Sequence, residues 1–249
     1  EYWSIEAWLQ SQASQQNSAL ATFSASLYKI KGKSLEKFGI ANKDQAQTIV
    51  EELKQCAFTV SKIERKEVSK NPLPPFTTST LQQEAVKRLY FSSKKTMFLA
   101  QRLYENGHIT YMRTDSVNLS ADSAVAAKKW LAKNLGAEYA RDAGRQFKTK
   151  SKLAQEAHEA IRPTQPENTP EKINLTETAE KKLYELIWQR FMASQMPQAR
   201  IATIAVEILA APRESQNANY QFRATGQRIT FDGYLKIWRQ KLEEKELPE

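Results

Sequence analysis

Residues that bind transition metals or form disulfides are scarce in this sequence. Its 249 residues include one cysteine, Cys56, and two histidines. A single cysteine excludes a disulfide within the chain and is typical of proteins from a reducing cytoplasm. Structural zinc sites use about four Cys and His ligands, so we expect no zinc site.

Long apolar runs are also missing. A helix needs about 20 consecutive apolar residues to cross a membrane. The best candidate, residues 201–211, is short and is interrupted by Glu207. No signal peptide is recognisable, and the first residue is Glu1 rather than Met. We therefore expect a cytoplasmic protein without a membrane partner, and a chain cut from a longer polypeptide.

Negative charge is in short supply. The chain has 37 Lys and Arg against 28 Asp and Glu, a formal net charge of +9 and a pI near 9.4. This balance predicts a polyanionic partner, nucleic acid before an anionic membrane, although a merely basic protein is the alternative. One stretch reads as an exposed basic loop because it has little apolar content. Its cations are Arg141, Arg145, Lys148, Lys150 and Lys152.

Both ends of the chain have the alternating pattern of strands. One helix lies among them, residues 42–56, with Asn42 as its expected N-cap. In the strand that follows, we expect Phe58, Val60 and Ile63 to point inward. The strand segments are residues 19–32, 58–68, 199–210 and 220–238. The expected turns are at Gly226 and at Asp232-Gly233.

Between these ends the sequence becomes helical. Three prolines in the segment NPLPPF stiffen the chain and mark a domain boundary. The predicted fold is α+β, with a β-rich domain from residues 1–74 and 197–249 and an inserted helical domain, residues 75–196. Helix, turn, helix and strand over residues 78–116 is the pattern of a winged helix-turn-helix. The expected helices are residues 78–91, 93–107, 120–136, 151–164 and 176–196.

One short stretch carries an unusual set of polar side chains. In HITYMRTDS, Tyr111, Arg113 and Asp115 are spaced two residues apart. We expect a strand here, in which alternate side chains share a face, so a phenol, a guanidinium and a carboxylate would stand together. The simplest alternative is the edge of a β-hairpin with one aromatic residue.

The first two of these side chains suit attack on a phosphodiester. A tyrosine hydroxyl ordinarily has a pKa near 10, so about 0.1% of it is ionised at neutral pH, and a nucleophilic phenol needs a cation nearby. The planar guanidinium of Arg113 would orient a phosphate and stabilise the charge that builds up on it. A phenolate is also a fair leaving group, so the ester that forms can be reversed.

A second cluster lies in EAHEAIRPT. His158 and Arg162 are four residues apart and would share a helix face. Arg162 precedes Pro163, which would end the helix and leave the guanidinium free to reach a phosphate. The alternative is a solvated helix in which Glu156, Glu159 and Arg162 pair locally, and the residue types alone favour it.

Both clusters resemble segments of one family. YENGHITYMRTDSVNLS resembles the active-site segment of bacterial type IA DNA topoisomerases. TSTLQQEA, KKTMFLAQRLYE, EAHEAIRPT and RITFDGYLKIW resemble further segments of that family, in the same order. The resemblance implies a winged-helix-like domain that holds the tyrosine, together with a β-rich arch.

The resemblance also implies roles for single residues. Tyr111 would attack one DNA strand and stay joined to the 5′ phosphate while another strand passes through the break, which is then resealed, relaxing negative supercoils. Arg113 matches an arginine that grips the scissile phosphate, and His158 matches a histidine implicated in binding DNA beside the break. Further residues that the resemblance places near the site are Gln101, Glu105, Asp115 and Arg162.

Two segments of the family are not found in the sequence: the acidic DxDxE of the metal-binding TOPRIM domain and the glycine-rich GIGRPSTYA. In the family, Mg²⁺ and a lysine and a glutamate that assist phosphoryl transfer belong to the missing part. We therefore expect a fragment that binds DNA, preferably single-stranded segments, but holds no metal or cofactor and does not relax DNA alone. Its expected partners are the TOPRIM and remaining domains of the same polypeptide.

Two other functions fit parts of the sequence. A non-catalytic winged helix-turn-helix would bind DNA through its second helix, with Lys94, Lys95 and Arg102. This alternative is disfavoured by Tyr111 and Asp115, because a DNA-binding wing needs cations and these side chains supply a phenol and a carboxylate. The other alternative is a protein-interaction platform on the β-rich domain, and the salt dependence of DNA binding separates it from the rest.

We expect the chain to bind single-stranded DNA weakly and with strong salt dependence. If about three phosphates are contacted, the plot of log K against log salt should have a slope of roughly −2. Titrating a labelled oligonucleotide at several NaCl concentrations measures this slope. A flat plot would favour the protein-interaction alternative.

Overall fold

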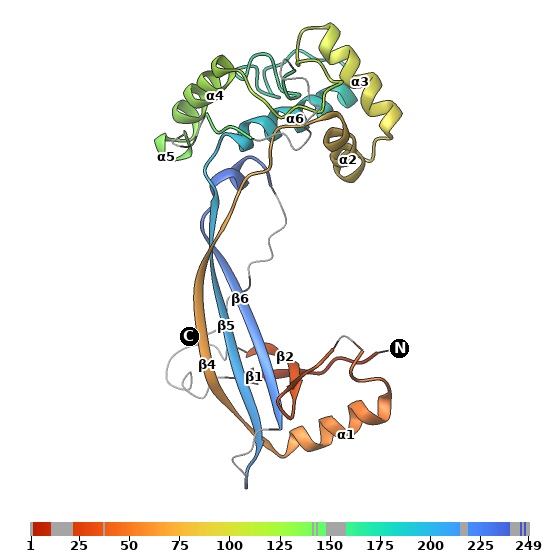
Figure 1. Ribbon diagram of the computed structural model, residues 1–249, viewed down its shortest axis with the longest axis vertical. Helices are drawn as coiled ribbons and strands as arrows, with labels where there is room; N and C mark the ends of the chain where they lie inside the picture. Colours follow the sequence, from red (N-terminus) through yellow and green to blue (C-terminus); the bar gives the residue numbers. More distant parts are fainter. Residues whose placement is uncertain are drawn as a thin grey trace. The chain divides into compact units, whose positions relative to one another are not determined.

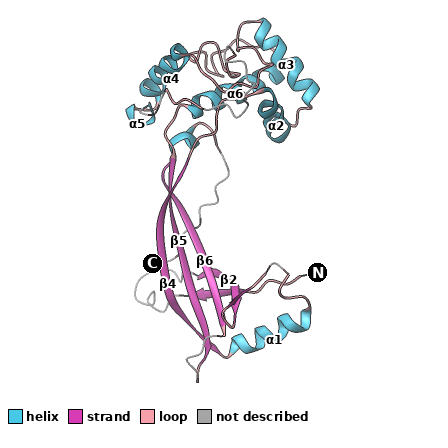
Figure 2. Ribbon diagram, viewed as in Figure 1, coloured by secondary structure: helices cyan, strands magenta, loops and turns pink. Residues whose placement is uncertain are grey.

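The chain folds into two compact units, described here one at a time (Figures 1 and 2). The sheet unit comprises Glu1–Val68, Ile201–Thr230 and Leu242–Glu249, and the helical unit comprises Ser69–Arg200 and Phe231–Lys241. The predicted α+β class is confirmed. Within the described part of the chain, none of the helices is both long enough and apolar enough to cross a membrane. The computed structural model describes residues 2–10, 22–36, 38–140, 142, 144–147, 158–214, 219–239, 245 and 247.

The sheet unit brings together strands from the two ends of the chain (Figure 2). The strand order is β1-β2-β6-β5-β4, and β3 pairs with β2. β2 is antiparallel to β6, with Ser26 opposite Arg223 and Ile30 opposite Tyr220. The strands are β1 (Glu6–Gln10), β2 (Thr22–Ile30), β3 (Lys33–Ser34), β4 (Cys56–Lys70), β5 (Ala199–Pro212) and β6 (Tyr220–Phe231).

One face of the sheet carries the core of this unit. The helix α1 (Lys43–Lys54) contributes Leu53, which is buried in the same cluster as Phe222 of β6. The helix begins as predicted, because the Asn42 Oδ1 accepts a hydrogen bond from the Gln45 N–H at 2.8 Å.

Two predictions about the strands are wrong. Val60 and Ile63 are 51% and 50% exposed, because β4 is the outermost of the described strands on its side and most of its residues are exposed. Gly226 is not in a turn, since β6 runs through it. A Cβ at Gly226 would lie 2.7 Å from the carbonyl oxygen of Lys245, so this glycine permits a close backbone approach.

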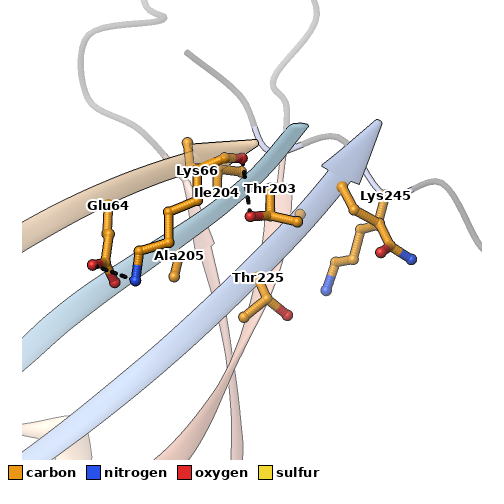
Figure 3. A pocket seen from close by; sticks show the side chains of 9 residues that line it. Glu64, Lys66, Thr203, Ile204, Ala205, Thr225 and Lys245 are labelled. Carbon is orange, nitrogen blue, oxygen red and sulfur yellow. Dashed lines mark hydrogen bonds and ion pairs between the residues drawn. The ribbon is translucent and has the colours of Figure 1, made fainter. Parts of the chain in front are cut away.

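A surface hollow of about 480 Å³ lies over β4, β5 and β6 (Figure 3). Its charged groups are partly paired. The Lys66 Nζ is 2.8 Å from Glu64 Oε1, and the Thr203 Oγ1 donates to the Lys66 carbonyl at 3.2 Å. We assign no chemistry to this hollow because Lys66 is already neutralised by a carboxylate and the other lysine, Lys245, donates to the Ser24 hydroxyl at 3.1 Å.

The helical unit is built around α6, which runs from Thr178 to Ser194 (Figure 1). Leu183, Ile187 and Phe191 of this helix have no exposed surface. The second of the two consecutive helices, expected over residues 93–107, ends just before a left-handed glycine, Gly107, with φ at 73°. The other helices are α2 (Thr78–Leu89), α3 (Ser93–Glu105), α4 (Ala121–Asn134), α5 (Ala137–Ala140) and the 3₁₀ helix η2 (Gly233–Lys236).

The segment after β6, which the sequence analysis assigned to the β-rich domain, packs in the helical unit. Trp238 is 1% exposed, and its ring centroid lies 4.0 Å from the guanidinium carbon of Arg88 and 4.9 Å from that of Arg190. Burial lowers the pKa of Arg190 to about 10, which still leaves it charged at neutral pH. The expected turn at Asp232-Gly233 is instead the start of η2.

We expect Phe222→Ala to lower the free energy of unfolding of the sheet unit by about 3–5 kcal/mol, because the buried ring leaves a cavity beside Phe58. The measurement is urea denaturation followed by a probe in this unit. Val60→Ala on the exposed strand is the control, with an expected change within about 0.5 kcal/mol. Equal losses in the two variants would contradict the assigned core.

Candidate active site

The segment that carries the tyrosine is not a strand, and its backbone bends at Met112 and Arg113. Tyr111 is 44% exposed, while its neighbour Met112 is 1% exposed. Arg113 and Asp115 are exposed and Thr114 is buried, so the alternation of outward and inward side chains is present. The predicted strand is wrong because the stretch makes an isolated β-bridge, at Ile109, while Met112 and Thr114 bond to Thr78 at the start of a helix.

Thr78, at the start of α2, holds this segment. Its Oγ1 donates to the Met112 carbonyl at 2.7 Å and accepts from the Thr114 N–H at 2.9 Å. Its own N–H donates to the Thr114 carbonyl at 2.9 Å. These bonds fix the backbone on both sides of Arg113, whose side chain therefore projects from a rigid stretch.

The second predicted cluster is not helical where the structure describes it. The expected helix covered residues 151–164; residues 151–157 lie outside the described part, and residues 158–164 are extended. Thr110 joins this stretch to the tyrosine segment. Its N–H donates to the Arg162 carbonyl at 2.9 Å, and its Oγ1 donates to the Ala160 carbonyl at 2.7 Å. His158 and Arg162 therefore do not share a helix face, because backbone groups of this stretch bond to other segments instead of forming helical hydrogen bonds.

Arg162 points inward, contrary to the expectation that it reaches outward. Its guanidinium donates to Glu159 Oε2 at 2.7 Å and to the Pro163 carbonyl at 2.9 Å, and its side chain is 11% exposed. The other oxygen of Glu159 accepts from the N–H of Ser120, which caps α4. Arg162 thus ties the His158 stretch to α4.

Tyr111 lies at a small hollow. Its ring packs edge-to-face on that of Tyr104, with centroids 5.2 Å apart. The hollow has a volume of about 270 Å³, and its other lining residues are Thr110, Thr114, His158 and Glu159.

A larger hollow of about 630 Å³ adjoins the first one, because Thr114 and His158 line both. The structure therefore brings together Tyr111, Arg113 and His158, three residues that the sequence analysis selected. An exposed phenol beside a guanidinium and an imidazole suits phosphate binding and nucleophilic attack. The larger hollow is lined by Thr78, Ser79, Gln82, Arg113, Thr114, Asp115 and His158.

Four of the residues predicted to bind DNA lie on α3 and do not line either hollow. The Gln101 Nε2 donates to Glu105 Oε1 at 2.6 Å, one helical turn away. Lys94 and Lys95 are exposed at the start of the helix. These four polar residues share α3 with Tyr104, so they lie on the element that supports the tyrosine ring.

Arg102, the last selected residue of α3, is occupied by carboxylates. Its guanidinium lies 2.6 Å from Glu177 and 2.7 Å from Glu180, a residue at the start of α6. This pairing fastens α3 to α6 and makes a DNA contact through Arg102 less favourable.

The predicted basic loop falls largely outside the described part of the chain. Arg145 is described, and its guanidinium lies 3.0 Å from Asp142. Outside the described residues are Arg141, Lys148, Lys150 and Lys152.

Residue patterns did not reveal the groups that position the site. Thr78, Thr110 and Glu159 act through backbone or charge contacts with segments far away in the sequence. The one available signal was the segment TSTLQQEA, which the sequence analysis noted for its resemblance and which contains Thr78, Ser79 and Gln82.

The described residues do not fit a magnesium site. Across the described ranges, no cluster of three or more His, Cys, Asp and Glu side chains is placed to hold a metal ion. Of the nearby carboxylates, Glu159 is engaged by Arg162 and Glu105 by Gln101. We therefore derive no chemical step through a metal held by these residues.

The chain is similar to DNA topoisomerases over its whole length. A family profile described as DNA topoisomerase matches residues 1–249. DNA topoisomerase 1 of Rickettsia felis is 43% identical over 98% of this chain and 31% of the relative, and that of Mycobacterium tuberculosis is 40% identical over 98% and 28%. The solved structure of full-length topoisomerase I from Thermotoga maritima matches with a TM-score of 0.71 and 33% identity, over 91% of this chain and 36% of that one.

We expect Thr78→Val to lower the free energy of unfolding of the helical unit by about 1–3 kcal/mol, because buried backbone groups of Met112 and Thr114 lose their partner. Chemical denaturation followed by a probe in this unit measures the loss. Ser79→Ala is the control, since the Ser79 hydroxyl is exposed and bonds Thr77 alone among the described residues. A Thr78 variant as stable as this control would show that the hydroxyl does not hold the segment.

Proposed function

Because this chain belongs to the family of bacterial type IA DNA topoisomerases, we propose that it forms the strand-cleaving part of such an enzyme and that Tyr111 is its nucleophile. One observation carries the proposal. The exposed phenol lies in a hollow that shares Thr114 and His158 with the hollow of Arg113. A phosphodiester at this junction has a nucleophile and a cationic clamp within reach.

In the proposed reaction, the Tyr111 Oη attacks the phosphorus of one DNA strand. The P–O3′ bond breaks, the phenol loses its proton, and the departing 3′ oxygen takes one up. The 5′ phosphate stays bound to the tyrosine as an ester, another strand passes, and attack by the 3′ hydroxyl reverses the step. The break can be resealed without outside energy because the ester conserves the energy of the broken bond, and the free energy stored in negative supercoils drives their relaxation.

The residues of this chain position the reaction. Arg113 binds the phosphate and stabilises the negative charge that develops on it in the transition state. Thr78 fixes the backbone on both sides of Arg113, so the guanidinium is held in place before the reaction. The Tyr104 ring restricts the orientation of the Tyr111 ring. Arg162 keeps His158 in place through Glu159 instead of binding DNA itself.

DNA, preferably single-stranded, is the proposed partner of the exposed polar side chains around the tyrosine. They offer both charge and hydrogen bonds for a strand that enters along α3. The proposed DNA-binding residues are Lys94, Lys95, Gln101, Glu105, Asp115 and His158.

The chain spans about a third of the length of the topoisomerases that it matches. We propose that the remaining part of the longer polypeptide supplies a TOPRIM domain with Mg²⁺, and that the whole acts on DNA in the bacterial cytoplasm. The ion would supply positive charge for the phosphate during cleavage.

A non-catalytic winged-helix module is the second candidate, supported by the exposed pair Lys94 and Lys95 at the start of α3. The structure weakens it in two ways. Arg102 is paired with two glutamates, and the stretch after α3 is not a strand among the described residues.

We expect Tyr111→Phe to abolish the covalent adduct between DNA and the longer polypeptide, because the substitution removes only the nucleophilic oxygen. Denaturing gels of the protein trapped on end-labelled single-stranded DNA show the adduct. Tyr104→Phe is the matched control and should still form it, since its ring can pack as before. An adduct that persists in the Tyr111 variant would refute the assignment.

We also expect this chain alone not to relax negatively supercoiled plasmid, even with Mg²⁺. An alkoxide is a poor leaving group that needs a proton donor, and the phosphate needs more positive charge than Arg113 provides. Gel electrophoresis after incubation distinguishes the outcomes. A ladder of relaxed topoisomers would show that the catalytic groups are complete in this chain.

A further inference from the structure

We propose that the hollow lined by Gln82, Arg113 and Asp115 is a base-binding subsite for a nucleobase with an exocyclic amino group beside an unprotonated ring nitrogen, as in adenine. The inference rests on the proposed function, because it requires a DNA strand whose phosphate lies at Arg113. It adds recognition of one base to the cleavage chemistry.

The hollow is lined by polar side chains that can still form hydrogen bonds with a ligand. Within the described part of the chain, the side chains of Gln82, Arg113, Asp115 and His158 make no hydrogen bond or ion pair. Polar groups elsewhere in the site are engaged; Glu159, for example, binds Arg162 and Ser120. A ligand that enters the hollow therefore meets donors and acceptors that need not give up a protein partner.

The chemistry of these groups favours a base over a second phosphate. The Asp115 carboxylate would repel a phosphate, whereas it accepts hydrogen bonds from an amino group. The Gln82 side-chain amide adds an N–H donor, which suits an unprotonated ring nitrogen. Arg113 is left for the phosphate, and single-stranded DNA exposes the base edge that a duplex hides.

The arrangement predicts which base edge fits. Cytosine carries the same amino group beside an unprotonated ring nitrogen as adenine, and adenine is the probe used in the test below. The amino group of adenine donates to the Asp115 carboxylate, while the adjacent ring nitrogen accepts from the Gln82 Nε2–H. Hypoxanthine has the same shape but carries a carbonyl oxygen and a ring N–H at these two places. Both polar partners would then be mismatched, so hypoxanthine should bind more weakly.

Both recognition groups stand on fixed backbone. Gln82 follows Leu81 in α2, and Leu81 is fully buried. Asp115 lies between Thr114, which Thr78 holds on both sides, and Ser116, which has no exposed surface. A rigid pair of this kind supports selection between bases.

The experiment measures binding of this chain to a set of fluorescein-labelled oligothymidylates at low salt. Each oligonucleotide carries one deoxyadenosine at a different position, and a matched set carries deoxyinosine, whose base is hypoxanthine, instead. Fluorescence anisotropy gives a dissociation constant for each. At one position we expect adenine to bind about 5- to 150-fold more tightly than hypoxanthine, the range for one well-placed pair of base contacts.

Three variants test which side chains cause the difference in affinity between adenine and hypoxanthine. Gln82→Ala and Asp115→Asn should bring the adenine-to-hypoxanthine ratio at that position close to one. Gln83→Ala is the matched control, because Gln83 is the next residue of the same helix, is exposed and does not line the hollow. It should keep the full ratio.

A ratio near one at every position would overturn the inference, as would a ratio that survives Gln82→Ala. In either case DNA binding itself, and with it the proposed function, would stand. Failure of every oligonucleotide to bind would instead contradict both the subsite and the DNA binding proposed for the chain. Circular dichroism of each variant checks that α2 is intact.

Discussion

Two threonine hydroxyls hold the geometry of the candidate active site. The tyrosine segment and the His158 stretch are neither helix nor regular strand and share an isolated β-bridge, Ile109 with Pro163, so most of their backbone groups need other partners. Thr78 satisfies groups on both sides of Arg113, and Thr110 joins the tyrosine segment to the Ala160–Arg162 backbone. Exposed side chains can then project from irregular backbone without that backbone being loose. The proposed cleavage would benefit, because a preorganised clamp needs no rearrangement when charge develops.

The cations of the helical unit fall into two kinds with different roles. Arg102, Arg162 and Arg190 are occupied by carboxylates, carbonyl oxygens or aromatic rings. Arg113 and Lys94 have no such partner among the described residues. Sequence alone could not separate these groups, because whether an arginine is free depends on which carboxylates the fold brings to it. The outward reach expected of Arg162 was wrong for this reason.

Local patterns identified most of the helices and the four longest of the described strands. Asn42 and Gly107 act at helix ends as their residue types suggest, and the family segments pointed to Tyr111 and Arg113. The failures have a common physical cause. The helix expected through His158 and the strand expected at Tyr111 are replaced in the described residues by bonds between distant segments. Short-range periodicity carries no information about such bonds, and the exposure of Val60 likewise depends on the place of β4 in the sheet.

The packing of Trp238 against Phe76, Arg88 and Arg190 has a consequence for synthesis of the chain on the ribosome. Residues 69–200 of the helical unit emerge before residues 231–241, which complete its core. Until Trp238 arrives, Phe76 and the guanidinium of Arg190 lack the ring against which they pack. The helical unit therefore cannot complete its core while β5 and β6 are being translated, and the surface of Phe76 that Trp238 will cover stays exposed to water during that time. Its last packing step is set by the pace of the ribosome and not only by its own folding.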